Sequence, residues 1–272
     1  MLNSTVLDVA LGLVFCWGAV ALVASSVYES ISSLLKLRAN GLLDGVKELL
    51  NDKDFTGLAQ SVYRNALVNP RDPGTSTTES QLTVKPSYID PLHFAAALLE
   101  AIQGAPEAAA DLKAGIGEVK NDQIRKMLIG MCARAGGKIA EVEKQLASWF
   151  SAGMERVSGV YKRKAQLFSF LIAFVVAAAL NIDTFHLCSA LWAHAADVVG
   201  LSAAPTTASQ ALKALNQLPV GWTSGRPFSP LWPLGWLATA CSALFGAPFW
   251  FGLLQRLVNL RGTGPKPAAS QA

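Results

Sequence analysis

The chain has 272 residues, of which 51% are hydrophobic and 15% are charged, and its formal net charge is +4. Soluble domains carry roughly 25% charged residues, so this composition excludes an ordinary soluble globular protein. The apolar excess lies in three segments, which predicts an integral membrane protein. The 4 cysteines form no Cys-x-x-Cys pair, so neither a disulfide framework nor a zinc site is indicated.

The first apolar segment runs from Val9 to Val27 and contains 19 residues without a charge. A helix needs about 20 such residues to cross a hydrocarbon core, so we expect a first transmembrane helix within residues 1–35. Residues 1–8 contain no Lys or Arg, whereas a secretory signal begins with a basic region. The sequence therefore predicts an uncleaved anchor.

Basic residues are unequally distributed along the chain. Residues 36–166 hold 18 of the 23 Lys and Arg, whereas residues 181–233 hold two, Lys213 and Arg226. Cytoplasmic flanks of membrane helices are enriched in Lys and Arg. Residues 36–164 are therefore predicted to be cytoplasmic and the loop 194–233 periplasmic, which places the N-terminus outside and the C-terminus inside.

The cytoplasmic region, residues 36–164, is predicted to be a helical domain. Apolar residues recur at steps of three and four within 42–50 and 58–67, as on one face of a helix. Asp90 followed by Pro91 is typical of a helix start. Further helices are expected over about 121–134 and 137–164, the last one running on into the membrane. Residues 69–86 are polar and turn-rich, which predicts a mobile loop.

The second span is predicted over residues 165–193. Its uncharged run, Leu167 to Leu180, has 14 residues, which make only about 21 Å of helix. A crossing must therefore use part of the segment that follows, and we expect Asn181 and Asp183 near the outer interface.

The third span is predicted over residues 234–255, with a kink at Gly246-Ala247-Pro248 because proline removes a helix hydrogen bond. Before it, Trp222, Trp232 and Trp236 suit an aromatic belt at the outer interface. After it, residues 256–272 lack apolar periodicity and are predicted to be disordered.

Four ionisable residues after the second apolar run, Asp183, His186, His194 and Asp197, would share one face of a continuous helix. The eleven residues from Asp183 to His194 span about 16 Å of helix, and each Asp/His pair supplies two ligands where zinc needs three or four. We therefore predict no metal site. Asn181, Asp183 and His186 remain a candidate polar membrane site, whose role is either a structural cap or ion handling.

Sequence motifs of enzymes are missing. Gly137-Lys138 resembles the end of a phosphate loop, but Cys132 stands where that loop needs glycine and Ile139 where it needs Ser or Thr. A turn between helices is predicted instead. There is no Gly-x-Ser-x-Gly, and His93 has no nucleophile near it in sequence. We predict that the chain is not an enzyme, needs no cofactor and binds no nucleic acid.

The segment before the second span combines an apolar stripe with basic residues. The stripe consists of Trp149, Phe150, Met154, Val157 and Tyr161. It can lie with its basic neighbours against anionic lipid headgroups, or it can pack on the domain's own helices. The candidate contacts to lipid or to a protein partner are Trp149, Arg156, Tyr161, Lys162, Arg163 and Lys164.

Four segments carry a resemblance to known sequences: PSYIDPLHFAAALLEAI (86–102), WFSAGMERVSGVYKRKAQ (149–166), LNIDT (180–184) and GAPFWFGLLQRLVNLRGTGPKP (246–267). In these segments the chain resembles a group of bacterial inner-membrane proteins. The resemblance implies a multi-pass protein of the bacterial inner membrane with three spans. It implies no activity, catalytic residue or cofactor.

Together these observations predict an all-α integral membrane protein with three transmembrane helices and a helical cytoplasmic domain. The predicted function is a membrane-anchored structural or adaptor protein that presents this domain to a protein partner. The alternative is an oligomeric channel with Asp183 near its outer mouth, which needs several copies because three helices line no wide path alone. Membrane lipid is the other expected partner.

Overall fold

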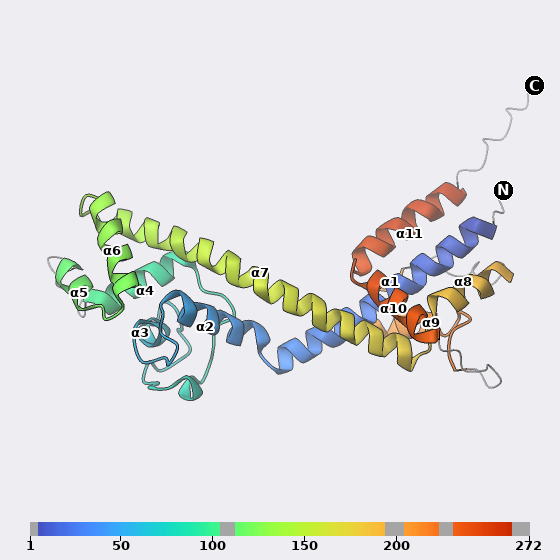
Figure 1. The fold of residues 1–272 in the computed structure, drawn as a ribbon, viewed down its shortest axis with the longest axis horizontal. Helices are drawn as coiled ribbons and strands as arrows, with labels where there is room; N and C mark the ends of the chain where they lie inside the picture. The colour runs from blue at the N-terminus through green and yellow to red at the C-terminus, as the bar shows by residue number, and fades with distance from the viewer. Residues whose placement is uncertain (1–4, 104–111, 194–203, 223–230, 263–272) are drawn as a thin grey trace, which may run out of the picture. The chain divides into compact units, whose positions relative to one another are not determined.

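The computed structural model describes residues 5–103, 112–193, 204–222 and 231–262 (Figure 1). Every regular element in these ranges is a helix, which confirms the all-α prediction. The chain divides into two compact units. Unit 1 combines Met1–Ile31 with Lys164–Ala272, and unit 2 is the intervening segment Ser32–Arg163.

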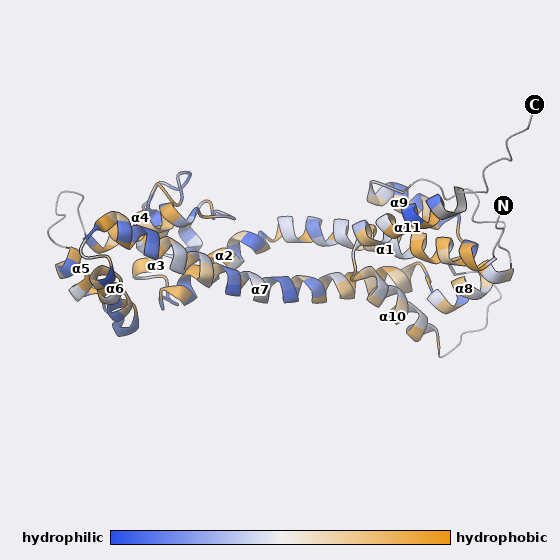
Figure 2. Ribbon diagram, turned by 90° about the horizontal axis from the view of Figure 1, so that it is seen from above, coloured by the Kyte–Doolittle hydropathy of each residue, from blue (hydrophilic) through white to orange (hydrophobic). Residues whose placement is uncertain are grey.

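Unit 2 is a helical domain with its own apolar core. Its elements are α2 (Leu37–Leu49), α3 (Leu58–Arg64), the 3-10 helix η1 (Glu79–Gln81), α4 (Pro91–Gln103), α5 (Leu112–Glu118), α6 (Asp122–Arg134) and the first part of α7 (Ile139–Ala179). Figure 2 shows hydrophilic and hydrophobic residues interleaved along these helices, as amphipathic helices require. The seven-residue α5 escaped the sequence analysis because it buries only Leu112 and Ile116, too few to show a period.

Side chains begin two helices of unit 2 as the sequence indicates. The Asp90 carboxylate accepts hydrogen bonds from the backbone N–H groups of Leu92 at 2.9 Å and His93 at 3.4 Å. Asn121 caps α6 by accepting from Ile124 N at 3.0 Å. Each cap satisfies backbone donors that have no partner within the helix.

The loop between α3 and α4, which the sequence predicts to be mobile, contains several hydrogen bonds between its own residues. Asp72 accepts from the backbone of Gly74 and Thr83, at 2.9 and 3.1 Å, and buried Asn69 donates to Val84 O at 2.8 Å. Asn69 and Asp72, which the sequence indicates only as turn-forming residues, thus connect distant parts of the loop through their side chains.

Glu79 forms an ion pair of 2.9 Å with Lys47 of α2, which ties the loop to that helix, and a second of 2.9 Å with Lys85 within the loop. Hydrogen bonds from Lys85 and then Lys47 lower the pKa of Glu79. The stabilisation from this carboxylate is therefore complete above its ordinary pKa and is lost as the pH falls through the lowered one.

Helix α2 packs antiparallel against α7 through glycines. A Cβ built at Gly41 would lie 3.6 Å from the Tyr161 ring, one at Gly45 2.8 Å from Val157, and one at Gly153 2.5 Å from Leu49. As the number on α2 rises, the number of its partner on α7 falls, which fixes the opposite direction of the two helices. The missing side chains at Gly45 and Gly153 permit the close approach of the two backbones.

Unit 1 contains α1 (Thr5–Leu34) up to Ile31, the part of α7 from Lys164 onward, α8 (Thr184–Ala193), α9 (Ala208–Leu215), α10 (Trp232–Ala243) and α11 (Ala247–Gly262). Within the described ranges, α1 is the single helix long and apolar enough to cross a membrane by itself. The pairs α7 with α8 and α10 with α11 pass the same test only together, and they bend by 50° and 90°.

The helix of the third predicted span bends by 90° where the sequence predicts a kink, and it is interrupted there. Helix α10 ends at Ala243, α11 begins at Ala247, and Gly246 between them has a φ of +83°. Pro248 has no N–H to donate one turn back, and the left-handed backbone at Gly246 ends the helix before the proline.

The predicted disordered tail also needs correction. Helix α11 continues to Gly262, so residues 256–262 are helical, and Leu257 and Val258 pack against the core of unit 1. These two side chains are too few to give a periodic signal, and the contact that orders them comes from other helices. Residues 263–272 lie outside the described residues.

We expect Gly153→Val to destabilise unit 2, because the new side chain overlaps Leu49 across the α2–α7 contact. Overpacking of this kind costs about 1–3 kcal/mol. Gly159→Val is the matched control, since Gly159 lies on the same helix and a Cβ there meets nothing within 4 Å. Thermal unfolding of the detergent-solubilised chain checks this, and equal shifts for the two variants would contradict the close packing.

Candidate functional site

The break between α7 and α8 holds two of the three residues of the candidate polar membrane site. Helix α7 ends at Ala179, and Asn181 takes a left-handed backbone with a φ of +46°. The Ile182 N–H then donates back to Ala177 O at 2.7 Å. Asparagine tolerates this conformation better than most residues, which explains why the chain can bend by 50° at this point in an otherwise apolar segment.

The side chain of Asn181 joins three segments of unit 1. It is 2% exposed; its Nδ2 donates to Gly221 O at 3.0 Å, and its Oδ1 accepts from Trp236 Nε1 at 3.1 Å. Beside it, Trp222 Nε1 donates to Ala179 O at 2.9 Å. Two tryptophans predicted to form an interfacial belt thus hydrogen-bond the end of α7 directly.

Asp183 caps α8. Its Oδ1 accepts from the backbone N–H groups of Phe185 at 2.9 Å and His186 at 3.2 Å, and the residue is 7% exposed. Gly235 of α10 lies directly against it, so that a Cβ at this glycine would overlap the carboxylate. The carboxylate therefore satisfies two helix-end donors under the cover of α10.

Two threonines connect this break to α10 and α1. The Thr239 hydroxyl, fully buried, lies 2.7 Å from Ile182 O and 2.8 Å from Thr184 Oγ1. Thr184 Oγ1 also accepts from Trp17 Nε1 at 3.1 Å. Trp17 lies near the middle of the uncharged run Val9 to Val27, so Thr184 and Thr239 lie beside the middle of that run.

We call Asn181, Asp183, Thr184 and Thr239 the polar junction. Its buried polar groups are hydrogen-bonded, as buried groups in an apolar environment must be. His186 is half-buried on α8, whereas His194 and Asp197 lie outside the described residues. In the part of the chain that the structure describes, no three His, Cys, Asp or Glu residues are placed to hold a metal ion. The contacts observed at Asp183 are those of a helix cap.

The apolar stripe before the second span packs on unit 2 itself, the second of the two alternatives left open by the sequence. Phe150 stacks on Phe94 with ring centroids 4.0 Å apart, and Trp149 and Met154 pack against the same core. The Tyr161 hydroxyl lies 3.3 Å from Ser32 Oγ. The basic candidates behave differently, because the four residues Arg156, Lys162, Arg163 and Lys164 are all exposed.

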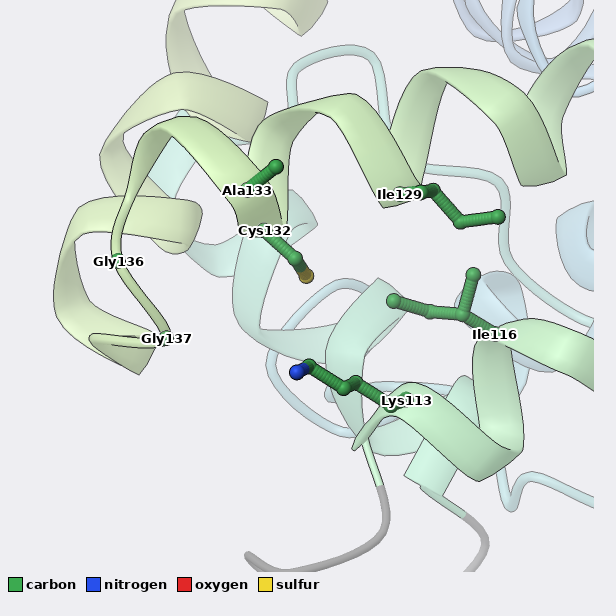
Figure 3. A pocket seen from close by; sticks show the side chains of 7 residues that line it. All are labelled: Lys113, Ile116, Ile129, Cys132, Ala133, Gly136 and Gly137. Atoms are coloured by element: carbon green, nitrogen blue, oxygen red, sulfur yellow. The ribbon is translucent and has the colours of Figure 1, made fainter.

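A pocket of about 550 Å³ opens between α5 and α6 (Figure 3). The Lys113 and Cys132 side chains point into it, with Ile116 and Ile129 facing each other beside them. Burial raises the pKa of the Cys132 thiol, and Lys113 opposes this effect more weakly. The thiol therefore stays protonated at neutral pH, which is unsuited to a nucleophile.

The predicted turn after Cys132 is confirmed. Gly136 and Gly137 have φ values of +58° and +79° and join α6 to α7. Such angles favour glycine, so the two glycines serve the turn.

Comparison of the chain with protein-family models, with curated proteins and with solved structures finds no match.

If Asp183 acts as a cap, Asp183→Asn should keep most of the stability, because an asparagine oxygen accepts the same two bonds. Asp183→Ala should lose about 1 kcal/mol. Thermal unfolding of the full chain in detergent separates the two variants. Equal losses for Asn and Ala would show that the charge, and not the accepting oxygen, is what this position supplies.

Proposed function

We propose that the protein is a membrane-anchored adaptor that presents unit 2 on the cytoplasmic side to a protein partner. The observation that carries the proposal is the separation of the two cores. Unit 2 buries its own apolar cluster, centred on Phe94, Leu98, Leu128 and Phe150. Unit 1 buries another that includes most of α1. A separate domain on an apolar membrane unit is the organisation that an adaptor requires.

We propose three spans: α1, the bent pair α7 and α8, and the bent pair α10 and α11. The support for the second is the polar junction, which satisfies the backbone where α7 ends. Irregular backbone within a bilayer is tolerated only where protein or water satisfies it. For the third, Gly246 and Pro248 break the helix and Trp250 Nε1 donates to Ser242 O across the bend at 2.7 Å.

The proposed location is the bacterial inner membrane, as a multi-pass protein with the N-terminus outside. The location rests on the sequence resemblance and the orientation on the excess of Lys and Arg between residues 36 and 166. That the chain is not an enzyme belongs to the same proposal.

The contacts of Asp183 argue for an adaptor over a channel. A carboxylate that handles ions must face water or the ion, whereas Asp183 is 7% exposed and covered by Gly235. On unit 2, by contrast, Ile129 at the pocket between α5 and α6 is an apolar side chain that is 53% exposed. Exposed apolar residues beside a pocket are common in protein-binding surfaces, and we place the partner there.

A photo-crosslinking residue at Ile129 of the full chain, in native membranes, should give a discrete adduct with another protein. The same residue at Lys144, which is exposed on α7, is the control and should give none. The Lys113→Glu change should lower the Ile129 adduct without altering thermal unfolding, because Lys113 lines the same pocket. Adducts that contain only further copies of this chain would contradict the adaptor and favour the oligomer.

Orientation can be tested with an introduced cysteine at exposed Ser148. Ser148→Cys should react with a membrane-impermeant maleimide only after the cells are permeabilised. Natural Cys132 is a poor reporter, because it is 7% exposed and its pKa is raised, so it should label slowly on either side. Rapid labelling of Ser148→Cys in intact cells would place unit 2 outside and invert the topology.

A further inference from the structure

Five basic residues lie near the two ends of unit 2 in the chain, four of them within it and Lys164 directly after it on α7. We call them the basic collar: Lys36, Arg38, Lys162, Arg163 and Lys164. All five are exposed, and none takes part in the ion pairs found among the described residues. Their charge is therefore not neutralised by a carboxylate within those ranges.

Contacts within unit 2 bring the two halves of the basic collar together. Ser32 Oγ lies 3.3 Å from the Tyr161 hydroxyl, and Gly41 lies against the Tyr161 ring. Lys36 and Arg38 fall between these two contact points on one side, and Lys162 and Arg163 follow Tyr161 on the other. Residues more than 120 positions apart in sequence thus form one basic surface at one level of the α2–α7 pair.

The backbone at Lys36, in the basic collar, has a left-handed conformation. Lys36 sits between α1 and α2 with a φ of +49°, a conformation that costs a lysine energy. The turn exposes its neighbours, so that Leu34 and Leu35 are 83% and 56% exposed. On α7 the residues just beyond the collar are likewise uncovered, with Leu167 at 59% and Phe168 at 53%.

The exposed leucines and Phe168 lie next to the basic collar in the chain, as apolar acyl chains lie next to charged headgroups in a lipid surface. Acyl chains solvate the apolar side chains, which would be costly to leave in water. The long Lys and Arg side chains then reach the headgroups, with their methylene groups along the apolar layer. An acidic protein would meet the charges but would leave Leu34 and Phe168 without an equivalent apolar layer.

We propose that the basic collar binds the headgroup phosphates of anionic phospholipids and so gives the protein a preference for an anionic bilayer. This inference rests on the proposed membrane anchoring. It assigns to Lys162, Arg163 and Lys164 a lipid contact, while the apolar stripe before them belongs to the core of unit 2.

The test uses the full chain, purified in detergent and offered equal amounts of phosphatidylglycerol and phosphatidylcholine, with bound lipids counted by native mass spectrometry. The natural chain should retain more phosphatidylglycerol. The triple change of Lys162, Arg163 and Lys164 to Gln should lower that preference by about fivefold for each charge removed. The matched control changes Lys53, Lys120 and Lys138 to Gln, which removes equal charge from exposed positions outside the collar.

Two further measurements separate this inference from the proposed function. Lys162→Arg with Lys164→Arg should keep the preference, and all variants should unfold at the natural temperature, which excludes misfolding as the cause. If the collar and control triples lose the preference equally, or if the collar triple keeps it, the collar does not bind lipid. If instead the natural chain is recovered outside the membrane fraction, the proposed anchoring itself fails.

Discussion

The constraint on which unit 1 depends is that a helix broken among apolar residues must satisfy its free backbone groups internally. Asp183 accepts from the first N–H groups of α8, and Trp222 donates to the last carbonyl of α7. Thr239 reaches the carbonyl of Ile182 between them. A break without such partners costs several kcal/mol in hydrocarbon. The need for these hydrogen bonds therefore holds α10 and the segment before it against the break between α7 and α8.

In unit 2 the main contact between α2 and α7 is the close approach of their backbones at glycines. The glycines of α2 and α7 let the two helices pack antiparallel, and the stripe from Trp149 to Tyr161 becomes part of the domain's contacts. The same packing leaves the basic residues that follow the stripe in water or at a headgroup layer. One helix, α7, therefore serves the domain with its first half and the membrane unit with its second.

These two devices have a common consequence for function. Asp183 is the ionisable group that the sequence offers as a candidate for ion handling. In the structure its carboxylate caps α8. The groups left uncommitted are the basic collar and the pocket with exposed Ile129. These are the two surfaces at which we propose lipid and partner recognition.

The sequence by itself determined the helical class, the uncharged run of α1, the helix starts at Asp90 and near Asn121, and the glycine turn after Cys132, because each depends on residues close together in the chain. Tertiary structure decided what depends on distant partners. Asn181 acquired its role from Trp236, Asp183 its cover from Gly235, and the end of α11 its helical order from the core of unit 1. Periodicity shows which face of a helix is apolar, but it does not show which segment covers that face.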